Sequence, residues 1–137
     1  MRRAAGIVLA AMVFALPALA AESSEPVHRA NSPALQRCLE SDDGASTLGQ
    51  MRCIEAELKI QDGRLNTAYR AAQVDLNARQ KAKLLAAQRS WIAFRDADCA
   101  AWYDEDWGTI AKVLASDCLL TRTIERTDQL KDFTASH

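Results

Sequence analysis

Hydrophobic residues recur along most of the chain at steps of three, four and seven, the spacing of one face of an α-helix. The clearest run follows Ser46 and Thr47, either of which can cap the start of a helix. Its apolar positions are Met51, Ile54, Leu58, Leu65, Tyr69, Ala72 and Leu76. Gly63 falls inside this run and costs about 1 kcal/mol relative to alanine, which leaves room for a kink or a close helix contact there. The pattern predicts one long helix that starts at Thr47.

Two further stretches show the same spacing. One runs from about Ala78 to Tyr103, and its stripe residues are Leu84, Leu85, Gln88, Trp91, Ile92, Arg95, Cys99 and Trp102. The other runs from about Thr109 to Phe133 and carries Ile110, Val113, Leu114, Cys118, Leu120 or Thr121, Ile124 and Phe133. A short helix is expected near Pro33 to Glu40, and no segment alternates with the period of two that marks a strand. The sequence therefore predicts an all-α fold, a small antiparallel bundle of three main helices plus a short N-terminal helix.

The first 20 residues have the three parts of a secretory signal peptide. Arg2 and Arg3 give a positive start, an apolar run follows, and Ala18 and Ala20 stand where signal peptidase cleaves. After cleavage we expect no membrane span, and we expect the protein in the periplasm or secreted. The expected divisions are a signal peptide over 1–20, a flexible leader over 21–34 and one helical domain over 35–133.

All four cysteines lie after the expected cleavage site, and an even number of cysteines in an exported chain favours two disulfides. The sequence alone allows three pairings. In an antiparallel helix hairpin, however, facing residues are about equidistant from the turn. The midpoint of positions 38 and 53 falls beside Gly44, and that of positions 99 and 118 falls beside Gly108. We therefore predict the disulfides Cys38–Cys53 and Cys99–Cys118, each of which stabilises the fold by about 3 kcal/mol.

Charge and the remaining residue types narrow the choice of ligands. Removal of the signal peptide takes away two arginines and no acidic residue, so the formal charge changes from −1 to −3. A domain with this net charge has no electrostatic attraction to nucleic acid or to an anionic membrane. We expect neither a metal nor a cofactor, because the chain lacks C-x-x-C spacing and its only histidines are His28 and His137. We do not expect an enzyme, because no acid–base or nucleophile motif is present.

The segment QRSWIAFRDADC places Trp91, Arg95 and Cys99 four residues apart on one helical face. Because Cys99 is expected to face the third helix, Trp91 should lie in or near the same interface. We interpret Arg95 as packing beside the tryptophan while its head pairs with a carboxylate or with carbonyls at a helix end. Asp96 and Asp98 are too close in sequence to be sure partners. The other candidates are Glu125, Asp117 and Glu57. A ligand clamp at Arg95 is the weaker alternative.

The segment LNxxY places Leu65 and Tyr69 on one helical face, with Asn66 at its edge. Buried amide and phenol groups need hydrogen-bond partners, and Gln88 on the following helix can supply one. We interpret this segment as a structural polar seam in the bundle.

The stretch AWYDEDWG joins the second and third long helices and combines three aromatic residues with three consecutive acids. A turn between helices projects into solvent, and exposed aromatic side chains indicate a partner surface. The alternative is that the tryptophans cover the end of the core while the acids are merely solvated. The candidate partner-binding residues are Trp102, Tyr103, Asp104, Glu105, Asp106 and Trp107.

Taken together, these segments resemble the LprI-like lysozyme inhibitor family of exported bacterial proteins over about residues 35–133. The resemblance rests on Cys53, on LNxxY, on Q-x2-W-x3-R-D-x2-C and on C-x4-T-x2-R-x3-L. In this chain the last two patterns include Gln88, Asp96, Thr123, Arg126 and Leu130. The resemblance implies a small, disulfide-linked helical protein of the cell envelope, in some members an inhibitor of lysozyme. The chain departs from the family where YDEDWGT replaces a segment that is often glycine-rich and serine-bearing.

Two functions are compatible with these observations. The first is inhibition of a muramidase: C-type lysozymes are basic and have a long cleft, which an acidic, aromatic protrusion would suit. The second is a structural or adaptor module that binds another envelope protein through the same turn. Neither function involves catalysis.

Overall fold

The structure is a computed structural model that describes residues 31–136. The expected signal peptide and most of the expected leader lie outside the described residues. The described helices are α1 (Pro33–Glu40), α2 (Thr47–Ala71), α3 (Ala78–Ala100) and α4 (Thr109–Ala135), with two short 3-10 turns at Asp42–Ala45 and Glu105–Trp107. No strand is present in residues 31–136, so the predicted all-α class is confirmed. The last part of the predicted run, up to Leu76, belongs to the α2–α3 turn rather than to α2.

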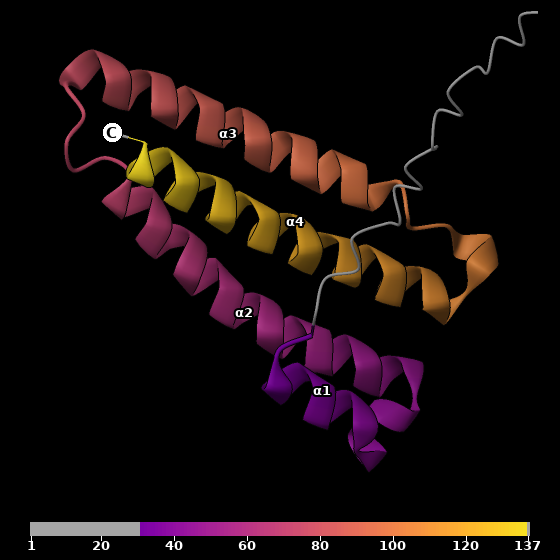
Figure 1. Cartoon of the computed structure of the whole chain (residues 1–137). Helices are drawn as coiled ribbons and strands as arrows, with labels where there is room; N and C mark the ends of the chain where they lie inside the picture. Colours follow the sequence, from indigo (N-terminus) through magenta and orange to yellow (C-terminus); the bar gives the residue numbers. More distant parts are fainter. Residues whose placement is uncertain (1–30, 137) are drawn as a thin grey trace, which may run out of the picture.

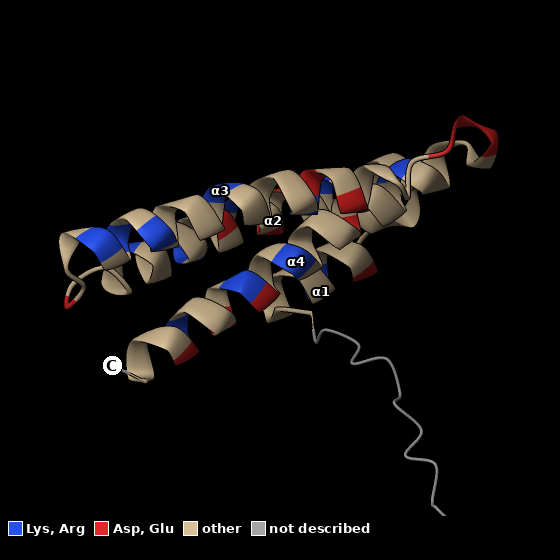
Figure 2. Cartoon of the chain, turned by 90° about the horizontal axis from the view of Figure 1, so that it is seen from above, with Lys and Arg blue, Asp and Glu red and all other residues tan. Residues whose placement is uncertain are grey.

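The three long helices form an up–down–up bundle in which α4 lies between α3 and α2 in the view of Figure 1. The short α1 packs against the first half of α2. Seen from above, α4 lies to one side and separates from α3 toward its C terminus (Figure 2). The bundle therefore has two distinct ends: one with the α3–α4 turn, and one with the α2–α3 turn and the end of α4.

Two buried clusters hold the helices together. The cluster near α1 contains Leu35, Cys53, Ile54, Val113 and Leu120. The cluster toward the α2–α3 turn contains Leu65, Ala68, Ala72, Leu76, Leu84 and Leu130, with Tyr69, Trp91 and Phe133 packed against it. Each fully buried leucine contributes about 1.5–3 kcal/mol of transfer free energy. The α2 pattern faces this core as predicted. The α3 pattern does so only in part, because Leu84, Gln88 and Cys99 are buried whereas Leu85, Ile92 and Trp102 are exposed.

Ser32 links the start of α1 to α2. The Ser32 hydroxyl accepts a hydrogen bond from the Leu35 amide (3.1 Å), which caps α1, and donates one to the buried carboxylate of Glu57 (2.8 Å). Pro33, at the start of α1, suits a position whose amide would have no helical partner. The last two residues of the expected leader, Pro33 and Ala34, therefore belong to the helix predicted near Pro33.

The disulfides are Cys38–Cys53, which joins α1 to α2, and Cys99–Cys118, which joins α3 to α4. Their Cα–Cα distances are 5.7 and 5.4 Å, and the pairing is the one predicted from the turn positions. Gly108 has a φ of 64°, a value that favours glycine, and it allows α4 to begin directly after the turn. Each disulfide closes a hairpin of neighbouring helices.

Gly63 provides a stability prediction because the expected close helix contact there is absent. A methyl group added at Gly63 would meet no atom within 4 Å. We expect Gly63→Ala to raise the free energy of unfolding by about 1 kcal/mol, since alanine is the better helix former. Urea denaturation followed by circular dichroism measures this. Gly49→Ala is the matched control and should destabilise the protein, because its new methyl group would collide with the backbone carbonyl of Asp43. A lower stability for Gly63→Ala would contradict the prediction.

Candidate functional site

The α3–α4 turn is a short, hydrogen-bonded structure rather than a loose loop. The side chain of Asp104 accepts a hydrogen bond from the Asp106 amide (2.9 Å) and caps the 3-10 turn. The amides of Trp107 and Gly108 donate to the carbonyls of Asp104 and Glu105, at 3.2 and 3.1 Å. These bonds hold the neighbouring side chains in a defined arrangement.

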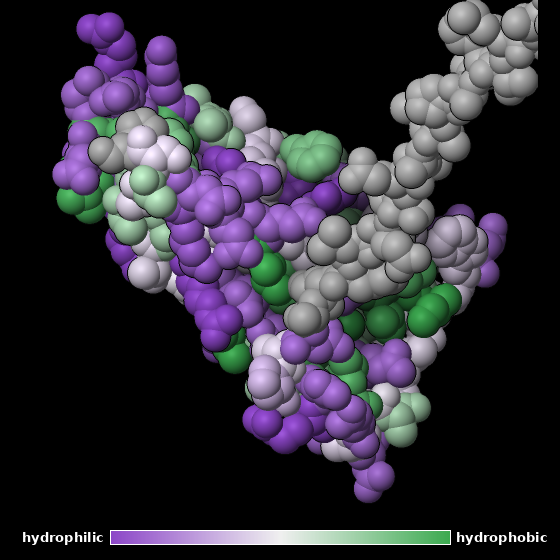
Figure 3. All heavy atoms as spheres, in the orientation of Figure 1, coloured by the Kyte–Doolittle hydropathy of each residue, from purple (hydrophilic) through white to green (hydrophobic). Residues whose placement is uncertain are grey.

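All six predicted partner-binding residues are exposed. The aromatic side chains Trp102, Tyr103 and Trp107 are 49, 46 and 53% exposed, so they do not close over the end of the core. Ile110 and Leu114, which the sequence placed on the apolar stripe of the third helix, are also exposed. Figure 3 shows hydrophobic surface at this end of the molecule. We call this surface the tip and define it as Trp102, Tyr103, Asp104, Glu105, Asp106, Trp107, Ile110 and Leu114.

The tip is also negatively charged. Residues 96–111 contain five acidic residues and no lysine or arginine, and Figure 2 shows the acidic turn projecting beyond the helices. The carboxylates of Glu105 and Asp106 have no hydrogen bond or ion pair with any described residue. The tip therefore combines exposed rings with uncompensated negative charge.

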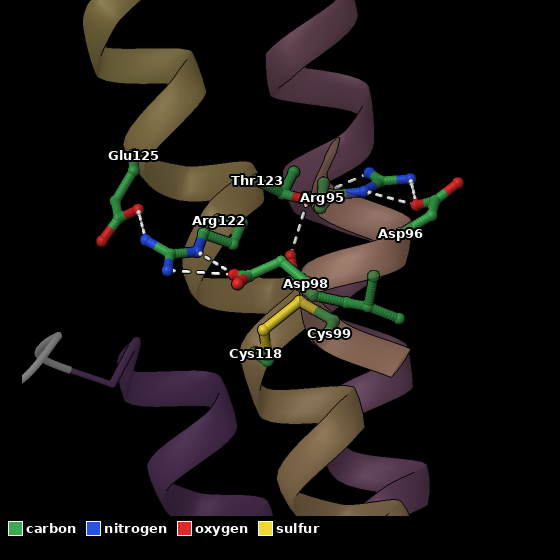
Figure 4. Close-up of a disulfide and its surroundings, with 9 residues drawn as sticks. Arg95, Asp96, Asp98, Cys99, Cys118, Arg122, Thr123 and Glu125 are labelled. Atoms are coloured by element: carbon green, nitrogen blue, oxygen red, sulfur yellow. Dashed lines mark hydrogen bonds and ion pairs between the residues drawn. A yellow bond between two sulfur atoms is a disulfide. The ribbon is translucent and has the colours of Figure 1, made fainter. Parts of the chain in front are cut away.

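A hollow of about 260 Å³ lies beside Trp102 and is also lined by Leu114, Thr121 and Arg122. Arg122 is held in place by Asp98 (3.0 Å) and Glu125 (3.1 Å), as Figure 4 shows. These hydrogen bonds, that of Glu125 first, raise the pKa of Arg122 above its ordinary value. The hollow therefore lies between the exposed Trp102 side chain and an ion-paired arginine, and Asp117 and Cys118 complete its lining.

Trp91 forms the centre of a second, partly buried group. The guanidinium carbons of Arg95 and Arg126 lie 5.1 and 5.9 Å from its ring centroid, within the range of cation–π attraction. The Arg126 Nε donates to the buried amide oxygen of Gln88 (3.0 Å), and Arg95 Nη1 donates to Thr123 (3.4 Å). These contacts join α3 to α4, which supports the structural interpretation of the stripe.

Arg95 pairs with carboxylates, as predicted, but its partners are Asp96, which was too close in sequence to be a sure partner, and Asp62, which was not among the candidates. Arg95 pairs with its neighbour Asp96 at 2.8 Å and with Asp62 of α2 at 3.8 Å (Figure 4 shows the first). Glu57, one of the proposed partners, instead accepts hydrogen bonds from Ser32 and Gln61. Asp96 directly follows Arg95 in the sequence, and residue spacing alone did not reveal that it would be a partner.

The predicted polar seam at LNxxY is also wrong in part. Leu65 is buried and Tyr69 packs against the core, but Asn66 is exposed. Gln88, the expected partner of this segment, accepts its hydrogen bond from Arg126 instead. A helix presents only a limited stripe to the core, and Asn66 lies outside it.

Among the described residues, one group has metal-ligating atoms close together: Asp98, Cys99 and Cys118, within 4.8 Å of one another. Both sulfurs are bonded to each other in the disulfide, so neither is available as a thiolate ligand. The group is a disulfide beside an ion pair, as Figure 4 shows.

The fold is that of a small, disulfide-linked helical protein, and this chain presents exposed aromatic side chains at one turn. Residues 38–130 match the family described as lysozyme inhibitor LprI, so the chain belongs to this family. The resemblance read from the sequence is therefore confirmed. No described helix is long and apolar enough to span a bilayer.

Three curated relatives illustrate the family. An uncharacterized protein of Rhizobium meliloti is 30% identical over 98 residues, an alignment that covers 61% of this chain and 70% of the relative. Lipoprotein LprI of Mycobacterium tuberculosis and that of Mycobacterium bovis are each 36% identical over 95 residues, which covers 69% of this chain and 44% of each lipoprotein. The chain thus spans less than half the length of these lipoproteins. No solved structure matches the chain.

Proposed function

We propose that this protein inhibits a muramidase by placing its tip over the substrate cleft of the enzyme. The observation that carries the proposal is the combination of three half-exposed rings with uncompensated acids at one rigid turn. Family membership supports the same function class. The protein acts by binding and not by catalysis, and it works in the periplasm or after secretion.

The rings and the acids have different tasks in this complex. Trp102, Tyr103 and Trp107 anchor the complex, because buried tryptophan and tyrosine side chains dominate binding energy at protein interfaces. The acids steer the encounter with a basic lysozyme surface. They lie at the rim of the contact, because acids beside the catalytic carboxylates of the cleft would be repelled.

Turbidity clearing of bacterial cell walls by a C-type lysozyme tests the proposal. Purified protein added at micromolar concentration should slow the clearing in a dose-dependent way. Unchanged clearing over that range removes the proposal for the lysozyme tested.

Neutralising the acids should slow binding without dismantling the turn. In the double variant Glu105→Gln/Asp106→Asn, the Asp104 cap remains intact. We expect the association rate measured by surface plasmon resonance to fall by about tenfold at low salt, with a smaller change in the dissociation rate. The difference from the unmodified protein should shrink as salt rises. Asp75→Asn, at the opposite end of the bundle, is the control; an equal effect there would contradict local steering.

An adaptor function is the second candidate, because the chain spans only 44% of the length of the LprI lipoproteins. If inhibitory contacts of those proteins lie in the part without a counterpart here, this chain supplies only the helical scaffold. The adaptor would bind a non-muramidase envelope protein through the same tip. A pull-down from periplasmic extract tests this function. Capture of a non-muramidase partner that no longer binds when Trp102 and Trp107 are replaced by alanine favours the adaptor function over inhibition.

A further inference from the structure

A groove of about 420 Å³ runs between the first half of α3 and the last half of α4, at the opposite end of the bundle from the tip. Each helix supplies four lining residues at the spacing i, i+3, i+4 and i+7, which is one helical face. The groove follows from the separation of α4 from α3 toward its C terminus (Figure 2). Its size lies within the range of about 300–1,000 Å³ that is typical of small-molecule sites.

The floor of the groove is apolar and belongs to the core. Leu84 and Leu130 are 8 and 2% exposed and are members of the same buried cluster, while Ala87 and Phe133 line the groove beside them. The apolar surface of the groove that faces water is therefore mainly that of Ala87, which is exposed, and of Phe133, which is half-buried. An apolar chain laid along the groove would cover this surface, which is favourable in proportion to the area covered.

The ionisable residues that line the groove are Lys83 and Arg126, and both are cations. Neither has a carboxylate within ion-pair distance among residues 31–136, whereas Arg95 and Arg122 each have two. Arg126 donates hydrogen bonds only to the neutral amides of Gln88 and Gln129. A guanidinium has five N–H donors, so donors remain for a further acceptor.

The surroundings of Arg126 also affect its charge. Burial lowers the pKa of Arg126 below its ordinary value, since partial removal from water disfavours the charged form. Residues 63–91, which include the first half of α3, carry six basic residues and one acidic residue. The lining of the groove thus carries two cations and no acidic residue although the whole protein is mildly acidic, and an anion would provide a countercharge.

We propose that this groove binds a monomeric amphiphile with a carboxylate head and a single hydrocarbon chain, such as a fatty acid. The carboxylate accepts hydrogen bonds from Arg126 and Lys83. The chain lies along Leu84, Ala87, Leu130 and Phe133. A small anion without an apolar part would not cover the apolar lining of the groove. An uncharged hydrocarbon would leave Arg126 without a countercharge. This site is independent of the tip and of muramidase binding.

Titration with dodecanoate below its micelle concentration tests the site. The double variant Trp102→Phe/Trp107→Phe leaves Trp91, whose ring centroid is 5.9 Å from the Arg126 guanidinium carbon, as the sole tryptophan. We expect a saturable change of Trp91 emission with one ligand per chain, and the same stoichiometry by calorimetry on the unmodified mature protein. Acetate should cause no saturable change. Dodecyltrimethylammonium, with the same chain length and a cationic head, should bind at least about tenfold more weakly.

Two variants separate a groove site from adsorption elsewhere. Arg126→Gln should raise the dissociation constant for dodecanoate by about ten- to a hundredfold, because it removes a hydrogen bond between charged groups, and the loss of such a bond weakens binding by this factor. Ala87→Trp fills the floor from an exposed position and should abolish binding with the charges in place; its melting curve checks that the fold is intact. Arg89→Gln, an exposed charge outside the groove, should change nothing.

Three results would overturn the proposal. They are equal affinity for the cationic amphiphile, unchanged dodecanoate binding by folded Ala87→Trp, and binding to anionic phospholipid vesicles without binding to monomeric dodecanoate. The last result would assign the basic end of the bundle to a membrane surface instead of a single chain.

Discussion

Replacing Trp102 and Trp107 together by alanine should raise the protein concentration needed for half-maximal inhibition of lysozyme by about thirtyfold or more, the effect of losing one interface hot spot of 2 kcal/mol. Both rings are about half exposed in the free protein, so their exposed faces are available for burial by the enzyme. The turbidity assay gives the inhibition, and surface plasmon resonance should place most of the loss in the dissociation rate.

The same substitution should leave the fold nearly unchanged. Side chains exposed to this degree usually alter stability by no more than about 0.5 kcal/mol, so the melting temperature separates loss of contact from loss of structure. Val74→Ala is the matched control, because Val74 is an exposed apolar residue at the opposite turn. Full inhibition by the double tryptophan variant would show that the contact with lysozyme lies outside the tip, and it would refute the proposed binding mode.

The helices and disulfides were predictable because they depend on local sequence. The periodic apolar residues of α2, α3 and α4 repeat over several turns, and Gly44 and Gly108 mark the α1–α2 and α3–α4 turns. Once the turns were located, the cysteines could pair only with facing positions on the neighbouring helix. Local signals of this kind do not require knowledge of how the three helices pack.

The details of the tip and of the arginine pairs depended on packing and were harder to predict. Ile110 and Leu114 were placed on the apolar stripe of α4, but in the same turn Ala111 and Val113 face the core, at 0 and 9% exposure, so Ile110 and Leu114 lie on another face of the helix and are exposed. The adjacent aromatic turn was the available signal that these residues belong to the tip. Likewise, the separation of α4 from α3, which creates the groove at Arg126, has no signature in the spacing of either helix.

Removing the Cys99–Cys118 disulfide should have a large effect on stability. The double variant Cys99→Ala/Cys118→Ala opens a loop with a sequence separation of 19, which should lower the free energy of unfolding by about 3 kcal/mol. For a domain of this size the melting temperature should fall by more than about 10 °C. Because the two cysteines enclose the whole α3–α4 turn, α3 and α4 should also separate at this end, and inhibition should weaken at temperatures where the variant is still folded.

The other disulfide provides the control that distinguishes the two consequences. Cys38→Ala/Cys53→Ala opens a loop with a sequence separation of 15 and should cost a similar free energy of unfolding. It ties α1 to α2, whereas the tip belongs to the turn between α3 and α4. We therefore expect this variant to lose stability but keep its inhibition while folded. Equal loss of inhibition in both variants would show that the tip depends on overall stability rather than on the local covalent link between α3 and α4.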